Sequence, residues 1–224
     1  MQHKRKLSVS MMCADLLNLQ QDIRRLEKAN VDYLHIDMMD GQFVPNLTFG
    51  IDALLAMRRA TKLPMDIHLL MNHPHTIIRS IDIQPGEIVS IHAECKDKII
   101  EHAGYVKLKG GLFGLVLNPT TKIEEVQKYL PYIDVITLML IVPGFAGSTM
   151  LHGIMEKVAY TRAFLDKRNY EHIQISVDGS VSKERAQYMA GLGANIFVGG
   201  TAGVFIKGRQ IEETIPEFYQ ALEI

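Results

Sequence analysis

Short apolar segments alternate with amphipathic segments along the whole chain. This alternation predicts β-strands that are each followed by a helix. We expect strands at residues 7–12, 33–40, 65–71, 87–93, 112–117, 135–142, 172–177 and 195–198. We expect helices at residues 16–29 (with Asp15 as N-cap), 51–61, 97–109, 122–129, 153–167, 183–192 and 210–222, and a short one opened by His73 and Pro74.

Roughly eight strand and helix pairs is the number that closes a parallel (β/α)8 TIM barrel. A chain of 224 residues lies within the length range of that α/β fold. A doubly wound open sheet uses the same alternation, but it concentrates its ligand near one switch point. Here polar residues follow many of the strands, which favours the barrel. We therefore predict one barrel domain over residues 1–224, with residues 1–6 as a flexible basic leader.

The charge balance restricts the partners of this protein. The chain carries 24 Lys and Arg against 25 Asp and Glu, a formal net charge of −1. This gives no field that would hold nucleic acid or an anionic membrane, so an anionic ligand must be bound locally. No apolar run is long enough for a transmembrane helix. The two cysteines, Cys13 and Cys95, lie far apart without CxxC spacing, which argues against a disulfide scaffold or zinc ribbon and favours a reduced, cytoplasmic setting.

A histidine and an aspartate stand two residues apart on the strand predicted at residues 33–40. Side chains alternate across a strand, so His35 and Asp37 face the same side. An imidazole and a carboxylate together suit a borderline divalent metal such as zinc. A buried hydrogen-bonded histidine is the commoner outcome for a single pair, so this pair needs further ligands to indicate a metal site.

A barrel would supply those further ligands, because the carboxyl ends of its strands meet at one rim. The polar residues expected at this rim are Ser10, His35, Asp37, His68 and Asp178. The two histidines and the two aspartates of this set make a four-ligand site for a divalent metal. The alternative is that His68 forms only a buried hydrogen bond with Asp66. His92 and Glu94 end another strand at this rim and are candidates for outer contacts.

Glycine-rich turns follow three successive predicted strands. They are Gly144 to Gly147, Gly179-Ser180 and Gly199-Gly200-Thr201. Glycine lets the backbone approach an anion closely, and backbone N–H groups supply donors without a lysine. Barrels often bind phosphate at the loops after strands seven and eight. Each turn alone is equally consistent with ordinary turn chemistry, whereas three together favour a phosphate site.

Four motifs resemble the ribulose-phosphate 3-epimerase family, and the resemblance runs from Ser10 to Thr201. The motifs are HIDMMDGQFVPN (His35 to Asn46), DIHLL (Asp66 to Leu70), PGFAG (Pro143 to Gly147) and VDGS (Val177 to Ser180). The resemblance implies a metal-dependent isomerase that inverts C3 of a phosphorylated 2-ketose. It further implies two-base proton transfer through a metal-stabilised enediolate. A small sugar phosphate is then the partner, and we expect a homo-oligomer.

The resemblance also assigns roles to individual residues. His35, Asp37, His68 and Asp178 would bind one divalent metal, with zinc expected and iron, manganese or cobalt as alternatives. Asp37 would accept the proton and Asp178 would donate it. The residues implied to bind substrate are Ser10 and His68 at the sugar, and Gly144, Phe145, Ala146, Gly147, Gly179, Ser180, Gly200 and Thr201 at the phosphate.

Several positions depart from the family pattern. Leu70 replaces a methionine, Val142 a polar residue, Ser148 a glutamine and Ser180 a glycine. VDGS and PGFAG look more like the branch that acts on D-allulose 6-phosphate than the D-ribulose 5-phosphate branch, so the substrate length stays open. A barrel lyase is a competing interpretation, but it needs a lysine at a strand end beside Asp37, and none is predicted there. A non-catalytic sugar-phosphate sensor is the other alternative.

Overall fold

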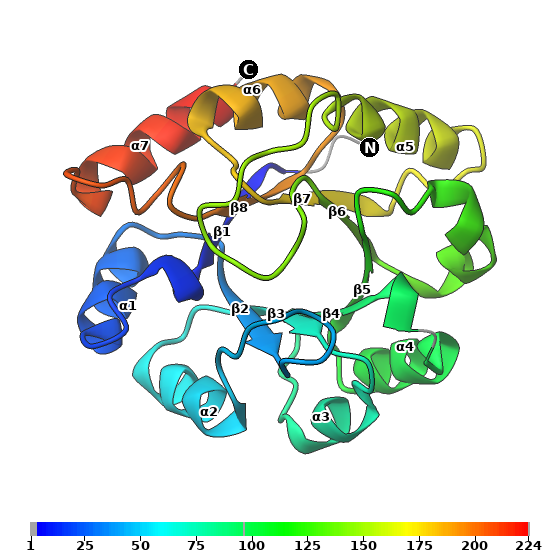
Figure 1. The fold of residues 1–224 in the computed structure, drawn as a ribbon, viewed down its shortest axis with the longest axis horizontal. Helices are drawn as coiled ribbons and strands as arrows, with labels where there is room; N and C mark the ends of the chain where they lie inside the picture. Colours follow the sequence, from blue (N-terminus) through cyan, green and yellow to red (C-terminus); the bar gives the residue numbers. More distant parts are fainter. Residues whose placement is uncertain (1–3, 96, 224) are drawn as a thin grey trace.

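Eight parallel strands close into a barrel with an outer ring of helices (Figure 1). The computed structural model describes residues 4–95 and 97–223. Each strand pairs with the next one in the chain, and β8 pairs with β1, which closes the sheet. The predicted single-domain (β/α)8 TIM barrel is therefore confirmed, and the open-sheet alternative is wrong.

The elements follow the predicted order. The strands are β1 (Lys6–Ser10), β2 (Tyr33–Met39), β3 (Met65–Leu70), β4 (Ile88–His92), β5 (Leu112–Leu117), β6 (Val135–Met139), β7 (Gln174–Asp178) and β8 (Ile196–Gly199). The α-helices are α1 (Leu19–Lys28), α2 (Ile51–Ala60), α3 (His75–Ser80), α4 (Ile99–Leu108), α5 (Glu156–Asp166), α6 (Lys183–Gly191) and α7 (Ile211–Leu222). The described residues also form the 3-10 helices η1 (Met11–Cys13), η2 (Ala93–Cys95) and η3 (Ile123–Tyr132). Among the described residues, none of the helices is long and apolar enough to cross a membrane.

Alternation along β2 explains how polar side chains come to lie inside the barrel. Leu34, Ile36 and Met38 are buried in the main hydrophobic core, which includes residues of the surrounding helices. The residues between them, including His35 and Asp37, point the other way, into the barrel. Every residue of β2 is buried, so the strand is covered on both faces.

The lower part of the barrel interior is apolar. Tyr33, Ile88, Val135 and Ile196 form a separate buried cluster, and each lies at the start of one of the even-numbered strands. Such a layer of four side chains from alternate strands is typical of TIM barrels. This layer fills the barrel at the amino-terminal ends of the strands. Polar side chains further along the strands therefore form the floor of a mouth at the carboxyl ends.

Two local predictions are corrected. Asp15 is not the N-cap of the first helix, because α1 begins at Leu19 after Asn18. The Asp15 carboxylate instead accepts hydrogen bonds from the Leu17 N–H and the Asn18 amide in a turn of its own. This turn leaves Leu17 95% exposed. The helix predicted at 122–129 is a 3-10 helix, η3, rather than an α-helix.

The basic leader predicted at residues 1–6 is only partly described. Residues 1–3 lie outside the described residues. Lys6 is the first residue of β1, so the barrel begins within the predicted leader. The Arg5 guanidinium donates a hydrogen bond to the carbonyl oxygen of Leu222, which joins this segment to the end of α7.

Candidate active site

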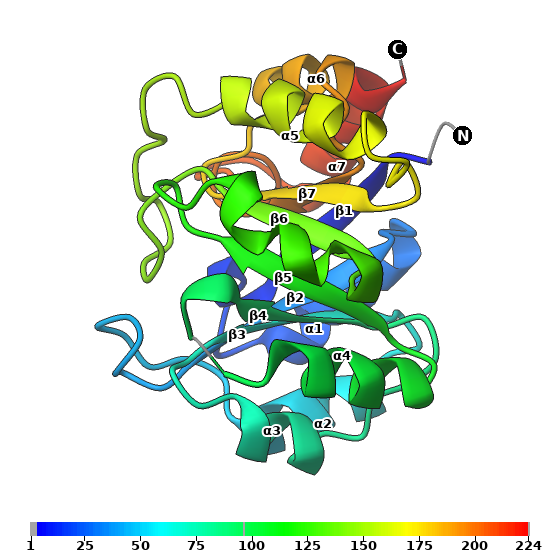
Figure 2. The same cartoon turned by 90° about the vertical axis from the view of Figure 1, so that its right-hand side faces the viewer.

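All eight strands end on the same side of the barrel, and long loops project from that side (Figure 2). The loop after β6 carries Gly144, and the loop after β2 carries Asn46. The Asn46 amide donates a hydrogen bond to the Gly144 carbonyl oxygen at 2.7 Å, which connects the two loops over the mouth. The mouth is therefore covered in part by segments that are far apart in the sequence.

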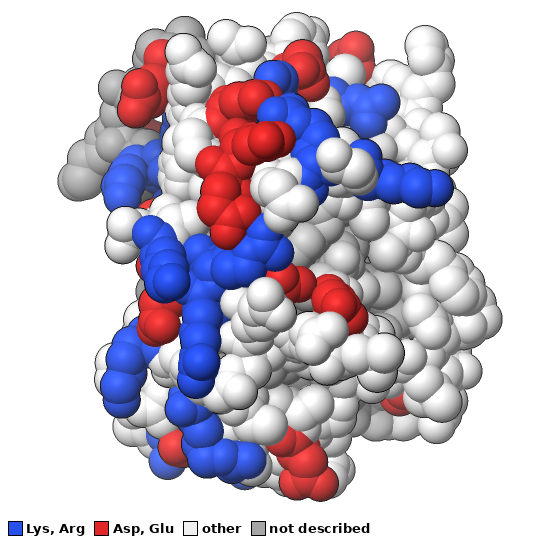
Figure 3. Space-filling view, turned by 90° about the vertical axis from the view of Figure 1, so that its left-hand side faces the viewer, with Lys and Arg blue, Asp and Glu red and all other residues white. Residues whose placement is uncertain are grey.

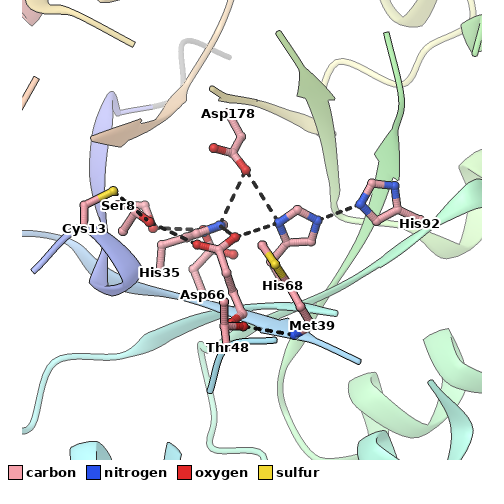
Figure 4. Close-up of polar contacts among 11 residues, drawn as sticks. Ser8, Cys13, His35, Met39, Thr48, Asp66, His68, His92 and Asp178 are labelled. Atoms are coloured by element: carbon pink, nitrogen blue, oxygen red, sulfur yellow. Dashed lines mark hydrogen bonds and ion pairs between the residues drawn. The ribbon is translucent and has the colours of Figure 1, made fainter. Parts of the chain in front are cut away.

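Four of the predicted rim residues converge at this mouth. His35 and Asp37 come from β2, His68 from β3 and Asp178 from β7 (Figure 4). One donor atom from each lies within 4.8 Å of the donor atoms of the other three. Asp37 and His68 are paired in register across β2 and β3, so their side chains enter the barrel side by side. The predicted convergence of these four residues is confirmed.

The distances within this cluster fit a bound metal ion. His35 Nε2 lies 3.3 Å from Asp37 Oδ1 and 3.7 Å from Asp178 Oδ2. His68 Nδ1 lies 3.4 Å and 3.5 Å from the same two oxygens. A tetrahedral zinc ion with bonds of about 2.0 to 2.1 Å separates its ligands by about 3.3 Å. Both nitrogens are buried without a hydrogen-bond partner, which a metal ion at this position would resolve.

Opposite charges favour one another within this cluster. Burial alone would lower the pKa of His35, but the Asp37 and Asp66 carboxylates outweigh it and hold that pKa well above its ordinary value. Burial acts on His68 in the same direction, and the Asp178 and Asp37 carboxylates beside its Nδ1 raise its pKa. Burial would raise the pKa of Asp37, yet both imidazolium groups lower it. The histidines and the carboxylates thus favour one another's charged forms, and a metal ion at this position would compete with protons for the same nitrogens.

Asp66 orients His35 rather than His68. The His35 Nδ1 donates to Asp66 Oδ2 at 2.8 Å, and the Ser8 hydroxyl donates to the same oxygen at 2.9 Å. A carboxylate can only accept, so Nδ1 of His35 carries the proton and Nε2 faces the metal position. The alternative in which His68 pairs with Asp66 is wrong. The reason is the parallel register, which places Asp66 directly beside His35.

A second chain of hydrogen bonds orients His68. Its Nε2 lies 2.9 Å from His92 Nε2, and His92 Nδ1 lies 3.2 Å from Glu94 Oε2. Burial lowers the pKa of His92 to about 4, so this ring is neutral. Because Glu94 can only accept, His92 holds its proton on Nδ1 and accepts at Nε2 from His68. Nδ1 of His68 is then left as the ligand atom.

Glu94 is the fixed end of this chain. Its Oε1 accepts from the Asn118 N–H at 2.9 Å and from the Thr121 hydroxyl, while its Oε2 serves His92. Burial would raise the pKa of Glu94, but these hydrogen bonds outweigh it and lower the pKa to about 2. The sequence indicated His92 and Glu94 as outer contacts by their place at a strand end. It gave no sign of Asn118 and Thr121.

Ser10 contacts the cluster directly. Its hydroxyl donates to Asp37 Oδ2 at 3.0 Å, while Asp37 Oδ1 faces the two histidines. The serine that the family resemblance places against the sugar thus also fixes the orientation of the Asp37 carboxylate.

A small pocket lies next to Asp178, at the ends of β7 and β8. It is lined by Ser10, Cys13, Gly147, Asp178, Gly179, Ser180, Val181, Val198, Gly200, Thr201 and Ala202. Gly147, Gly179, Ser180, Gly200 and Thr201 were predicted to bind phosphate, and the structure brings them together here. Gly144, Phe145 and Ala146 are not among the lining residues, and the Phe145 side chain is 54% exposed.

Backbone geometry requires glycine at Gly179. Its φ of +111° lies in a region that other residues rarely adopt. A Cβ atom there would lie 2.5 Å from a side-chain carbon of Ile141. The turn therefore brings the backbone close to Ile141, which follows β6, and places Gly179 in the lining of the pocket. Backbone N–H groups of such turns are suited to an anion.

Charged side chains are spread unevenly over the flank of the molecule that Figure 3 shows. Lys, Arg, Asp and Glu gather in the left and central parts of this view, whereas its right edge, toward the carboxyl ends of the strands, is mostly white. Over α1 and α7 the charges are paired, as between Arg25 and Glu212 at 2.6 Å. With a formal net charge of −1, the chain has no general field that attracts an anionic ligand, so the pocket itself must supply its donors.

Comparisons with known proteins agree with this geometry. The profile of the ribulose-phosphate 3 epimerase family matches residues 6–205. The chain is 34% identical over 197 residues to a ribulose-phosphate 3-epimerase of Bacillus subtilis, covering 88% of this chain and 91% of the relative. It is 36% identical over 190 residues to one of Chlamydia pneumoniae, covering 84% and 83%. A tryptophan synthase structure from Mycobacterium tuberculosis superposes with a TM-score of 0.68 at 12% identity over 99% of this chain and 93% of that one, which shows the shared fold alone.

Proposed function

Because the chain belongs to the ribulose-phosphate 3-epimerase family and is therefore an isomerase, we propose that it inverts C3 of a phosphorylated 2-ketose with the help of one divalent metal ion. The observation that carries the proposal is the convergence of His35, Asp37, His68 and Asp178 at the mouth of the barrel. Zinc is the metal we expect, because a set of two imidazoles and two carboxylates suits it; iron, manganese and cobalt are the alternatives.

Inversion at C3 requires two acid-base groups. One group removes the proton next to the C2 carbonyl, and another returns a proton to the opposite face of the carbon. β2, which carries Asp37, and β7, which carries Asp178, lie on different sides of the barrel, which suits proton transfer at two faces of one carbon (Figure 1). We assign Asp37 as the acceptor, with Ser10 orienting its carboxylate, and Asp178 as the donor. The metal, when bound, supplies a Lewis acid that polarises the carbonyl.

The loop after β6 completes the site. It carries Gly144 to Gly147, and its contact with Asn46 links it to the loop after β2. Closing this loop over the substrate would exclude water and protect the intermediate from loss of phosphate. The phosphate end of the substrate is assigned to the pocket that contains Gly179, Ser180, Gly200 and Thr201.

The substrate is a pentulose or a hexulose phosphate. D-ribulose 5-phosphate is the substrate class of the family, and the VDGS and PGFAG motifs favour D-allulose 6-phosphate. A pocket discriminates one extra carbon unit by only about 10- to 200-fold, so we expect activity on both with unequal kcat/KM.

The decisive experiment incubates the zinc-loaded protein with each ketose phosphate separately and follows inversion at C3 by NMR. Formation of D-xylulose 5-phosphate or D-fructose 6-phosphate supports the proposal. Binding of both compounds without any inversion would contradict it and favour a sugar-phosphate sensor.

Glu94 gives a prediction about metal affinity. Each of its oxygens accepts hydrogen bonds, so a glutamine must turn its NH2 group toward one set of donors, whichever way the amide is placed. We expect Glu94→Gln to weaken zinc binding by about 10- to 100-fold through misorientation of His68. Competition with a chelating dye measures this change. Glu213→Gln, on the exposed face of α7, is the control, and equal zinc affinity of both variants would contradict the role given to Glu94.

A further inference from the structure

Ser180 has an unusual backbone conformation for a serine. Its φ is +55°, and it shares a positive φ with two other non-glycine residues of the described chain, Asn30 and Asn169. Asparagine tolerates this region, whereas serine is disfavoured because its Cβ crowds the backbone carbonyl. Ser180 also lines the pocket assigned to phosphate. Something in the surroundings must hold it in this conformation.

Arg185 is positioned to do so. Its Nη1 lies 2.7 Å from the Ser180 carbonyl oxygen and 2.7 Å from Ser180 Oγ, so one nitrogen donates to both the backbone and the side chain. Arg185 stands in the first turn of α6, where its own N–H donates to the Ser182 hydroxyl oxygen. The neighbouring Glu184 carboxylate accepts from the Ser182 hydroxyl. The start of α6 thus fixes the point from which the guanidinium reaches Ser180.

These contacts determine what Ser180 can offer a ligand. Arginine has donors only, so Ser180 Oγ accepts from it and keeps its own proton to donate. A hydroxyl that accepts from a cation becomes a stronger donor, because hydrogen bonds in a chain polarise one another. The described residues that line the pocket include no lysine or arginine. They do include Asp178, which carries a carboxylate. A phosphate bound there therefore gains from a positive charge behind Ser180.

We propose that Arg185 is a positioning residue for the phosphate end of the substrate. It holds Ser180 in the left-handed conformation and turns the polarised Ser180 hydroxyl toward the anion, which Arg185 itself does not touch. The inference rests on the proposed function in placing phosphate in this pocket. Because the phosphate is remote from C3, the contribution falls mainly on substrate binding rather than on the chemical step.

The test compares Arg185→Met with the wild type. The variant keeps a long side chain but loses every donor. We expect KM for the ketose phosphate and the inhibition constant of inorganic phosphate to rise by about 10-fold each, with kcat changed less than about 2-fold. Arg185→Lys, which restores a cation with a different shape, should lie between the two proteins. Arg24→Met, on the exposed face of α1, is the matched control and should behave as the wild type.

A double-mutant cycle separates positioning from a general effect of charge or fold. Ser180→Gly adopts a positive φ freely and has no hydroxyl to orient, so Arg185→Met on that background should change KM by less than about 2-fold. Unchanged KM and phosphate inhibition in Arg185→Met would overturn the proposal. So would an equally large effect of Arg185→Met with and without Ser180. If Arg185→Met does not fold, Arg185→Lys carries the same cycle.

Failure of the proposed function would be distinguished from failure of this inference. A wild-type protein that inverts neither ketose phosphate contradicts the function. Binding of inorganic phosphate by calorimetry then still compares the wild type with Arg185→Met. Equal affinities would overturn the role of Arg185, and weaker binding by the variant would support it.

Discussion

Asp178→Asn is expected to abolish inversion at C3 in both directions while leaving the barrel intact. General acid-base catalysis contributes about 10²- to 10⁴-fold, and an amide cannot donate or accept the transferred proton as a carboxyl group does. Asparagine has nearly the same shape, and the aspartate side chain lies at the rim with 14% exposure, so we expect the barrel to accommodate the amide. Turnover of each epimer, followed by NMR, measures the loss.

Hydrogen exchange at C3 tests the assignment of Asp37 as proton acceptor and Asp178 as proton donor. In Asp178→Asn the acceptor Asp37 remains, so we expect one epimer of the substrate to exchange its C3 hydrogen with deuterated solvent without being inverted. Metal content, measured on the same sample, shows whether the amide still holds the ion. Asp166→Asn, which alters an exposed ion pair with Arg162 on α5, is the control. Near-normal inversion by Asp178→Asn would contradict the two-base scheme.

Removal of the metal is expected to have the second large effect. A chelator should abolish turnover, and zinc should restore it. A ligand that binds only the folded state at 1,000 times its Kd stabilises that state by about 4 kcal/mol. For a domain of this size such a change shifts Tm by roughly 8 to 16 °C. Differential scanning calorimetry with and without zinc measures the shift. Full activity and an unchanged Tm after chelation would rule out the metal site.

The same site predicts a pH dependence of zinc affinity. The nearby carboxylates raise the pKa of His35 and His68 despite burial, so each ring keeps its extra proton to a higher pH than a free histidine does. Zinc binds only the deprotonated rings, so binding releases protons and becomes tighter as pH rises. Calorimetry in buffers of different ionisation enthalpy counts the released protons. His172→Gln, an exposed site away from the cluster, should leave that number unchanged.

The sequence by itself determined the fold and the composition of the site. Apolar strand segments alternate with amphipathic helices, and this periodicity depends only on neighbouring residues in the chain. Polar residues at the strand ends could be assigned to one rim, because parallel strands in a barrel all end on the same side. The convergence of His35, Asp37, His68 and Asp178 followed from that rule. The start of α1 could not be predicted in this way, because the Asp15 carboxylate forms a turn with Leu17 and Asn18 instead of capping the helix.

Only the tertiary structure decided which partners orient these residues. Asp66 accepts a hydrogen bond from His35, and His92, held by Glu94, accepts one from His68. The register between strands determines these pairs, because it sets which side chains lie side by side. The contact of Arg185 with Ser180 likewise depends on a backbone angle and on the direction from which α6 starts. These are relations between segments in space, and residue types along one chain do not specify them. The sequence therefore indicated the candidate groups for the chemistry, and packing determined the direction in which each group points.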